Sequence, residues 1–298
     1  MAFRLVNTPR FAPYERLSPS QLQDELANKS VLITGGGKGI GAAIAKSFAE
    51  AGVSRIHISG RDQKNLNATA DEIICAFPAV QVVCHVTDIV SASDVAELFQ
   101  DIGTESPDVL VNNAGYMPNA CPFAEADLHD WWRGFEVNIL GTAQVVQAFL
   151  RHRRANSQQR DQLLPPAVVL SLNTAAALNY PVPSSTSYAS SKAALARFNE
   201  LLAVDVPESE ARFVALHPGV VKTDMYDRSP GAHLAPVTEA KLTGDWVVWA
   251  ASREADFLAG RFAWVNWDVD ALVSKKEEII EGNLLKTDLK EEKWRTEL

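Results

Sequence analysis

The sequence has few cysteines and no long apolar run. Cys75, Cys84 and Cys121 are its 3 cysteines, an odd number without the short spacings that are typical of zinc sites. We therefore expect reduced, buried thiols, with neither a disulfide framework nor a bound metal. Because no stretch approaches the ~18–20 consecutive apolar residues that a membrane span needs, we also expect no membrane association.

Positive charge is scarce as well. The chain has 28 Lys and Arg against 37 Asp and Glu, a net charge of -9 and a pI near 5.2. The phosphate backbone of nucleic acid attracts clustered Lys and Arg, so this balance argues against nucleic acid as a partner. The first fifteen or so residues lack the continuous apolar core and small-residue cleavage site of a secretory signal. We therefore expect a cytoplasmic protein.

Apolar runs and helical patterns alternate along most of the chain. Runs rich in Val, Ile and Leu predict strands at 31–34, 55–61, 80–86, 107–111, 167–172, 212–217 and 262–265. Helical spacing predicts helices at 42–51, 66–77, 92–102, 124–150 and 184–206, with a polar loop at 158–165. Such alternation predicts an α/β fold, a doubly wound (Rossmann) and mostly parallel sheet of about seven strands with helices on both faces.

The predicted elements fit a single catalytic domain. At 298 residues the chain has a normal length for one open α/β sheet with extensions. We expect an N-terminal extension at 1–28, a dinucleotide-binding catalytic domain at 29–267 and a charged C-terminal extension at 268–298. Arg151, Arg153 and Arg154, near the end of a long helix, are expected to be solvated charges that complement the helix dipole.

The residues from Val31 to Gly41 read VLITGGGKGIG. A run of glycines would weaken a strand or helix, so it predicts a turn in which backbone N–H groups approach a pyrophosphate closely. The helix that follows would direct its positive N-terminal end at that anion. A glycine cluster alone is also compatible with an ordinary surface turn, and it needs a second signal downstream.

That second signal is Tyr188-Ala189-Ser190-Ser191-Lys192. Residues four apart lie on one face of a helix, so Tyr188 and Lys192 can act together. A cation beside a phenol lowers its pKa from the usual ~10, which would make Tyr188 a usable acid or base. An isolated Tyr and Lys at this spacing would more often be coincidental, but here they follow a nucleotide-type loop.

Taken together, these motifs resemble the short-chain dehydrogenase/reductase family in its one-domain form, over roughly residues 29–267. The motifs stand in the order that the family shows. They are Thr34-Gly35 with Gly39 and Gly41, Asp88, Asn112-Asn113-Ala114-Gly115, Asn138, Tyr188 with Lys192, and Pro218-Gly219 with Thr223.

The resemblance implies roles for individual residues. Asp88 would hydrogen-bond the adenine, Asn112 and Gly115 would lie along the cofactor, and Thr223 would contact the nicotinamide carboxamide. Lys192 would also bind the nicotinamide ribose hydroxyls, while Asn138 would hold a water that completes a proton relay. The candidate cofactor-binding residues are Thr34, Gly35, Lys38, Gly39, Ile40, Gly41, Ser59, Arg61, Asp88, Asn112, Gly115, Tyr188, Lys192, Pro218, Gly219 and Thr223.

The end of the fifth predicted strand departs from the family pattern. The family usually carries Ser-Ser there, whereas this chain reads Ser171-Leu172-Asn173-Thr174-Ala175. The apolar alternation places Thr174 at the position of the catalytic serine. Its hydroxyl is the same donor and acceptor, but the added methyl restricts χ1. Asn173 is the alternative if Thr174 points away, and Ser171, inside the strand, is a weaker one.

Charge at the end of the second strand predicts which nicotinamide dinucleotide is bound. A carboxylate there favours NAD through the ribose 2′-hydroxyl, whereas the 2′-phosphate of NADP needs cations. This chain has Arg61 at that place, Lys38 in the glycine loop and the hydroxyl of Ser59 nearby. Asp62 is one residue further on and is expected to begin a helix instead. We therefore expect NADP.

The resulting hypothesis is an NADP(H)-dependent ketoreductase. It would transfer hydride between the nicotinamide and the carbonyl or secondary alcohol of a medium-sized, partly apolar substrate, with Tyr188, Lys192, Asn138 and Thr174 as catalytic residues. The alternative is a nucleotide-binding scaffold or sensor without redox turnover; a sugar-nucleotide epimerase lacks support from the glycine spacing. The predicted pocket residues lie in a lid at 225–236 (Met225, Tyr226, His233, Leu234) and opposite it (Tyr116, Met117, Tyr180, Pro181).

The helix predicted at 184–206 suggests an oligomer. It carries more apolar surface than a single sheet-facing stripe requires, and the resemblance implies that subunits pair through this helix and the one before it. We expect a homodimer or homotetramer. A monomer whose C-terminal extension covers this surface is the alternative.

Overall fold

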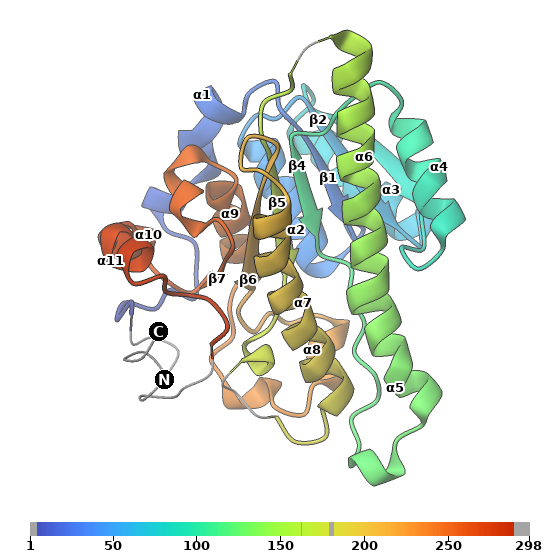
Figure 1. The fold of residues 1–298 in the computed structure, drawn as a ribbon, viewed down its shortest axis with the longest axis vertical. Coiled ribbons are helices and arrows are strands. Elements are labelled where there is room, and N and C mark those ends of the chain that lie inside the picture. Colours follow the sequence, from blue (N-terminus) through green and yellow to red (C-terminus); the bar gives the residue numbers. More distant parts are fainter. Residues whose placement is uncertain (1–4, 162, 179–181, 289–298) are drawn as a thin grey trace.

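A parallel sheet runs through the centre of the molecule (Figure 1). The computed structural model describes residues 5–161, 163–178 and 182–288. The sheet has 7 strands in the order β3-β2-β1-β4-β5-β6-β7, and every pairing is parallel. The strands are β1 (Ser30–Thr34), β2 (Arg55–Gly60), β3 (Gln81–Val86), β4 (Val109–Asn112), β5 (Ala167–Leu172), β6 (Ala211–His217) and β7 (Arg261–Trp264). The predicted fold class is confirmed, with strand ends within two residues of those expected.

Helices cover both faces of the sheet. α2 (Gly39–Glu50), α3 (Gln63–Ala76) and α9 (Ala240–Ala250) lie on one face, whereas α4 (Ala92–Ile102), α6 (Thr142–Arg160) and α7 (Thr186–Asp205) lie on the other (Figure 1). Alternate residues of a strand point to opposite faces. In β1, Val31 and Ile33 accordingly pack against the α2 side, while Leu32 packs with Val145 and Phe149 of α6.

Several short helices complete the chain. They are α1 (Gln23–Leu26), α5 (Leu128–Phe135), α8 (Asp224–Arg228), α10 (Val269–Val273) and α11 (Lys276–Glu281). A π-helical segment, Glu136–Gly141, joins α5 to α6 without a break. The long helix predicted at 124–150 is therefore present but continues to Arg160. The first residues of the loop expected at 158–165 are helical instead.

Arg151 and Arg154 are exposed as expected, but the expectations for Arg153 and for the cysteines are wrong. Arg153 is 4% exposed, and its guanidinium donates to the main-chain oxygens of Ser106, Pro107 and Pro165. Because α6 extends one and a half turns or more beyond it, Arg153 joins α6 to the neighbouring loops instead of complementing a helix end. The cysteines also differ from the prediction, since Cys75 is exposed and Cys84 and Cys121 are only partly buried.

The two extensions pack against the sheet and against each other. Val6 and Leu17 are buried in the core that lies on the α2 side of the sheet. The N–H of Arg10 donates to Asn266 O at 2.7 Å, and the N–H of Phe262 in β7 donates to Leu285 O at 2.8 Å. The domain boundaries inferred from the sequence remain a prediction. Among the described residues, no helix is both long and apolar enough to span a bilayer.

The order of the strands reverses between β1 and β4. In doubly wound sheets a ligand binds outside the carboxyl ends of the strands at such a switch point. The residues that follow β1, β4, β5 and β6 meet there, and they include the glycine loop, Asn112, Thr174 and Pro218.

A pair of buried histidines on β2 and β3 should make stability depend on pH. His57 Nδ1 and His85 Nε2 are 3.0 Å apart, and burial lowers both pKa values below the usual 6.5, that of His85 to about 4. As the pH falls, the histidines of the unfolded chain therefore take up protons before those of the folded chain. The free energy of unfolding should have its full value above pH ~6.5 and decrease below it, by at most ~1.4 kcal/mol per pH unit for each histidine.

Urea denaturation between pH 7.5 and 4.5 measures this dependence. His85→Gln, which retains a hydrogen-bonding side chain but does not titrate, should make it shallower. Some dependence should remain, because burial also lowers the pKa of His217, to about 3. An unchanged slope in the variant would exclude the pair as its source.

Candidate active site

The loop between β1 and α2 is a tight turn in which glycine is required at specific positions. Gly35 and Gly39 have φ values of +65° and +56°, in the left-handed region that glycine adopts without strain. A Cβ on Gly41 would lie 2.1 Å from the carbonyl oxygen of Gly35, so any side chain there would displace the turn. The loop therefore presents bare backbone at the N-terminus of α2, as an anion site needs.

A neighbouring residue, Asn113, holds this loop in place. Its Nδ2 donates to the carbonyl oxygens of Thr34 and Gly35 at 2.9 and 3.0 Å. In return, Thr34 Oγ1 accepts from the N–H groups of Asn113 and Ala114, both at 3.1 Å. Asn113 is the second asparagine of the Asn-Asn-Ala-Gly motif but was not among the expected site residues. These bonds tie the phosphate-type loop after β1 to the end of β4.

Several buried polar atoms along the same crevice are without partners among the described residues. Asn112 Oδ1, Ser59 Oγ and Thr87 Oγ1 are each buried and accept or donate no hydrogen bond there. Buried polar groups are almost always paired, so these atoms indicate a polar ligand. Their distribution over the ends of β4, β2 and β3 fits an extended molecule such as a dinucleotide.

The corner beyond β2 is polar and carries both charges. Arg61 is exposed there, and Asp62 begins α3, where its Oδ1 accepts from the N–H groups of Lys64 and Asn65 as expected for a helix start. Lys38 Nζ donates to Asp224 Oδ2 at 2.5 Å, which links the glycine loop to α8. Asp88, the expected adenine partner, accepts from Arg133 at 3.3 Å.

Tyr188 and Thr174 face each other across the crevice. Tyr188 lies in the first turn of α7, and Thr174 follows β5 after Asn173; its Oγ1 accepts from the N–H of Ala176 at 3.3 Å. Burial raises the pKa of Tyr188 to about 12, although the nearby Thr174 hydroxyl opposes this shift. The threonine hydroxyl therefore lies beside the tyrosine, where the apolar alternation of the sequence placed it.

Lys192 does not lower the pKa of Tyr188 in this structure, so that expectation is wrong. Its Nζ donates to the carbonyl oxygen of Leu172 at 2.8 Å, and the side chain is 4% exposed. Burial lowers the pKa of the ammonium to about 8. The spacing of four residues places both residues on one face of α7, but burial is the largest cause of both pKa shifts and neither shift includes an effect of the other group.

Asn138 lies in the π-helical segment and is completely buried. Its Oδ1 accepts from the Tyr116 N–H, and its Nδ2 donates to Tyr116 O and Ser191 Oγ, all at 2.9 Å. A Cβ on Gly115 would lie 3.3 Å from Asn138 Oδ1 and 3.5 Å from Lys192 Nζ. Gly115 thus lets these two side chains approach each other, and a π-helical turn is a frequent mark of a functional site.

The alternatives to Thr174 are committed to other partners. Ser171 Oγ accepts from Asn112 Nδ2 at 3.3 Å inside the sheet. The Asn173 side chain accepts from the Thr174 N–H at 2.8 Å and donates to Lys192 O at 3.0 Å. Both side chains are buried, so of the three residues Thr174 is the one that lies beside the phenol.

The segment after β6 covers the glycine loop. Gly219 has a φ of +77° and a Cβ there would lie 2.3 Å from Thr238 Oγ1, while Pro218 O accepts from Thr243 Oγ1 at 2.7 Å. Thr223 caps α8, and a Cβ on Gly39 would be only 3.2 Å from Thr223 Cγ2. Two of the expected cofactor residues, Gly39 of the glycine loop and Thr223, are therefore in contact range of each other.

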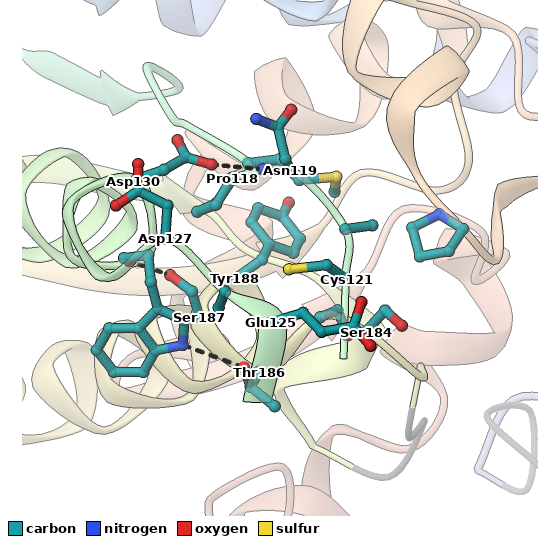
Figure 2. Close-up of a pocket in the computed structure, with 16 residues that line it drawn as sticks. Pro118, Asn119, Cys121, Glu125, Asp127, Asp130, Ser184, Thr186, Ser187 and Tyr188 are labelled. Carbon is teal, nitrogen blue, oxygen red and sulfur yellow. Dashed lines mark hydrogen bonds between the residues drawn. The ribbon is translucent and has the colours of Figure 1, made fainter. Parts of the chain in front are cut away.

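A cavity of about 290 Å³ opens beside Tyr188 (Figure 2). It is lined by residues 117–121, 125–127, 130–131, 184–188 and Pro230. Of the predicted pocket residues, Met117 lines it, whereas the Tyr116 hydroxyl points to Asp130, to which it donates at 2.5 Å. Tyr180 and Pro181 lie outside the described residues. The lid contributes Pro230 in place of the four residues expected from it.

Comparison with known proteins agrees with this geometry. The family model described as short chain dehydrogenase matches residues 29–232. The chain belongs to the short-chain dehydrogenase/reductase family. A short chain dehydrogenase/reductase of Claviceps purpurea (strain 20.1) is 31% identical over 280 residues, which cover 93% of this chain and 90% of the relative.

Solved structures share the fold. A 3-ketoacyl-(acyl-carrier-protein) reductase from Brucella melitensis, complexed with NADH, has a TM-score of 0.71 at 23% identity and covers 80% of this chain and 97% of its own. A short chain dehydrogenase from Shigella flexneri 2A str. 301, complexed with NADP, has a TM-score of 0.71 at 20% identity and covers 82% and 99%. As a short-chain dehydrogenase/reductase, the protein is an oxidoreductase that uses a nicotinamide cofactor, and the crevice described above fits one.

The hydrogen bonds from Asn113 to the glycine loop predict the effect of Asn113→Ala. Loss of two partly buried hydrogen bonds should lower the free energy of unfolding by ~1–3 kcal/mol and weaken NADPH and NADH to the same extent, because both cofactors contain the pyrophosphate. Thermal unfolding and titration of cofactor fluorescence measure the two effects. Asn199→Ala, at a buried asparagine of α7 outside the crevice, is the control and should change stability alone. Intact cofactor binding in Asn113→Ala would show that the glycine loop binds the cofactor without these hydrogen bonds.

Proposed function

We propose that the protein is an NADP(H)-dependent ketoreductase. The observation that carries this proposal is that Tyr188 lines the cavity with the Thr174 hydroxyl beside it. A protein that only bound a nucleotide would need no acid beside this cavity. The pairing therefore supports an enzyme over a scaffold or sensor.

Each of four side chains would have its own role in the reduction of a carbonyl. The nicotinamide, when bound, supplies hydride to the carbonyl carbon of the substrate. Thr174 holds the carbonyl oxygen by a hydrogen bond, and Tyr188 donates its phenolic proton to that oxygen. Lys192 holds the cofactor ribose, and Asn138 anchors the water through which Tyr188 recovers a proton.

The pKa of Tyr188 supports reduction as the direction. With a pKa of about 12, the phenol is protonated at neutral pH and is ready to donate. Oxidation of an alcohol would need the phenolate, which is rare at that pH.

The preference for NADP is supported by the cations at the end of β2 and in the glycine loop. Arg61 can form paired hydrogen bonds with a 2′-phosphate, and Lys38 adds a point charge. Lys38 is paired with Asp224 at 2.5 Å, so a phosphate would compete with that carboxylate for it. Ser59, with its buried unpaired hydroxyl, is the third candidate contact in this corner.

The cavity suggests the kind of substrate. Its volume suits a small to medium-sized ligand, and Met117, Pro118 and Trp131 supply apolar surface. Glu125, Asp127 and Asp130 add carboxylates to the wall. A neutral, partly apolar carbonyl compound fits this lining better than an anionic one.

The central test is Tyr188→Phe. We expect turnover of a panel of aromatic ketones and quinones, followed by cofactor absorbance, to fall below a few per cent of wild type, because the proton donor is lost. Binding of NADPH should change less than about twofold, since the glycine loop and Lys192 remain. Full activity in this variant would refute the assigned role, and a wild type that binds NADPH but reduces no carbonyl would favour the scaffold.

A second test concerns the cofactor. Arg61→Ala should weaken NADPH by roughly 10-fold or more and leave NADH almost unchanged, because a charge-assisted contact to the 2′-phosphate is removed. Arg151→Ala, which removes an exposed arginine of α6, serves as the control. Equal losses for both dinucleotides in Arg61→Ala would contradict the assignment of this corner.

A third test concerns assembly. Leu201 and Val204 of α7 are 46% and 79% exposed, and Trp132 and Leu140 of the preceding helical region are 55% and 50% exposed. Pairing of two subunits through these helices would bury this surface, so light scattering should show a dimer or tetramer. Val204→Glu should shift it towards monomer, whereas Ile280→Glu on α11 should not. A monomeric wild type at micromolar concentration would exclude the pairing.

A further inference from the structure

Asn173 stands between β5 and Thr174 and bonds to three elements at once. Its N–H donates to Leu216 O of β6 at 2.7 Å, its Oδ1 accepts from the Thr174 N–H at 2.8 Å, and its Nδ2 donates to Lys192 O of α7 at 3.0 Å. The residue is 3% exposed, and each of its side-chain polar atoms has a partner. It therefore joins the strand that carries Thr174 to the helix that carries Tyr188 and Lys192.

We propose that Asn173 is a positioning residue, which holds the Thr174 hydroxyl in place beside Tyr188. The inference rests on the proposed function, in which Thr174 and Tyr188 act on the same carbonyl oxygen. Asn173 itself does not contact that oxygen. It acts by fixing the main chain on both sides of the reaction centre.

The main chain of Lys192 and its side chain are both tied to the end of β5. Asn173 Nδ2 bonds the carbonyl oxygen of Lys192, and Lys192 Nζ bonds the carbonyl oxygen of Leu172 at 2.8 Å. Two links from consecutive residues to one lysine prevent α7 from sliding or rotating relative to β5. A bound cofactor would attract the Lys192 ammonium away from Leu172 O. The hydrogen bond from Asn173 Nδ2 to Lys192 O would then remain, because it does not involve the ammonium.

The main chain of Thr174 is held on its other side as well. The N–H of Ala175 donates to Nδ1 of His217, at the end of β6, at 3.3 Å. The N–H groups of Thr174 and Ala175 are thus both engaged, and the Thr174 Oγ1 accepts from the N–H of Ala176 at 3.3 Å. A β-branched side chain has few χ1 choices, so a fixed main chain also fixes the hydroxyl.

An asparagine suits this position because it supplies one acceptor and one donor on a short side chain. Alanine would remove both links and leave the N–H of Thr174 without its partner. A displacement of about 1 Å at a reacting group is sufficient to reduce turnover by roughly 100-fold. The loss from Asn173→Ala should therefore appear in catalysis much more than in cofactor binding.

The test is a double-mutant cycle between Asn173→Ala and Thr174→Val, on the panel carbonyl that the wild type reduces fastest. We expect Asn173→Ala to lower kcat/KM by about 10- to 100-fold with NADPH affinity within about twofold of wild type. In the Thr174→Val background, where no hydroxyl remains to be positioned, the same change should cost less than about twofold. Asn199→Ala, a buried asparagine further along α7, controls for general loss of stability.

A second variant, Asn173→Asp, gives a readout in pH. The carboxylate can still accept from the Thr174 N–H but faces the Lys192 carbonyl oxygen, and only its protonated form can donate there. Its activity should therefore rise towards wild type as the pH falls, while Asn173→Ala shows no such recovery. This variant also keeps the proposal testable if Asn173→Ala fails to fold.

Three results would overturn the proposal. They are equal losses from Asn173→Ala in both backgrounds, unchanged kcat/KM in the single variant, and a pH profile of Asn173→Asp that parallels the wild type. If Tyr188→Phe also remained active, the proposed function itself would fail; if Tyr188→Phe is inactive, only the role of Asn173 is refuted.

Discussion

The site depends on one constraint, the common direction of the strands. Because every pairing in the sheet is parallel, the carboxyl ends of β1, β4, β5 and β6 lie at the same edge, and residues separated by up to two hundred positions in the chain meet there. Packing the central strands between two layers of helices fixes their relative heights. The glycine loop, Asn112, Thr174 and Pro218 then need no further device to be brought together.

The common edge does not fix the exact path of each loop. Hydrogen bonds from asparagine side chains fix these paths. Asn113 ties the loop after β1 to the end of β4, Asn173 ties the end of β5 to α7, and Asn138 ties the π-helical segment to Tyr116 and Ser191. An amide side chain offers a donor and an acceptor in one plane without adding charge. It can therefore join two backbones in a buried crevice at a lower desolvation cost than an ion pair.

Sequence reasoning predicted the fold and the location of the crevice but not the contacts within it. Strand and helix periods are local, so the seven strands and the place of the glycine loop could be read from the sequence. The partners of Arg153 and Lys192 could not, because each is decided by burial against loops far away in the chain. The same applies to the pKa of Tyr188: a spacing of four residues shows that two groups share a helix face, whereas their desolvation depends on everything packed above them.

The strand edge at β7 shows how a feature outside the crevice limits association. The N–H of Phe262 is taken by Leu285 O, and a short antiparallel bridge joins Pro9 to Trp267 next to it. An exposed strand edge is a template onto which another chain can add. Here the segments around Pro9 and Leu285 of the same chain lie along that edge, so they shield this side of the sheet from the addition of another strand, and removing them would expose it.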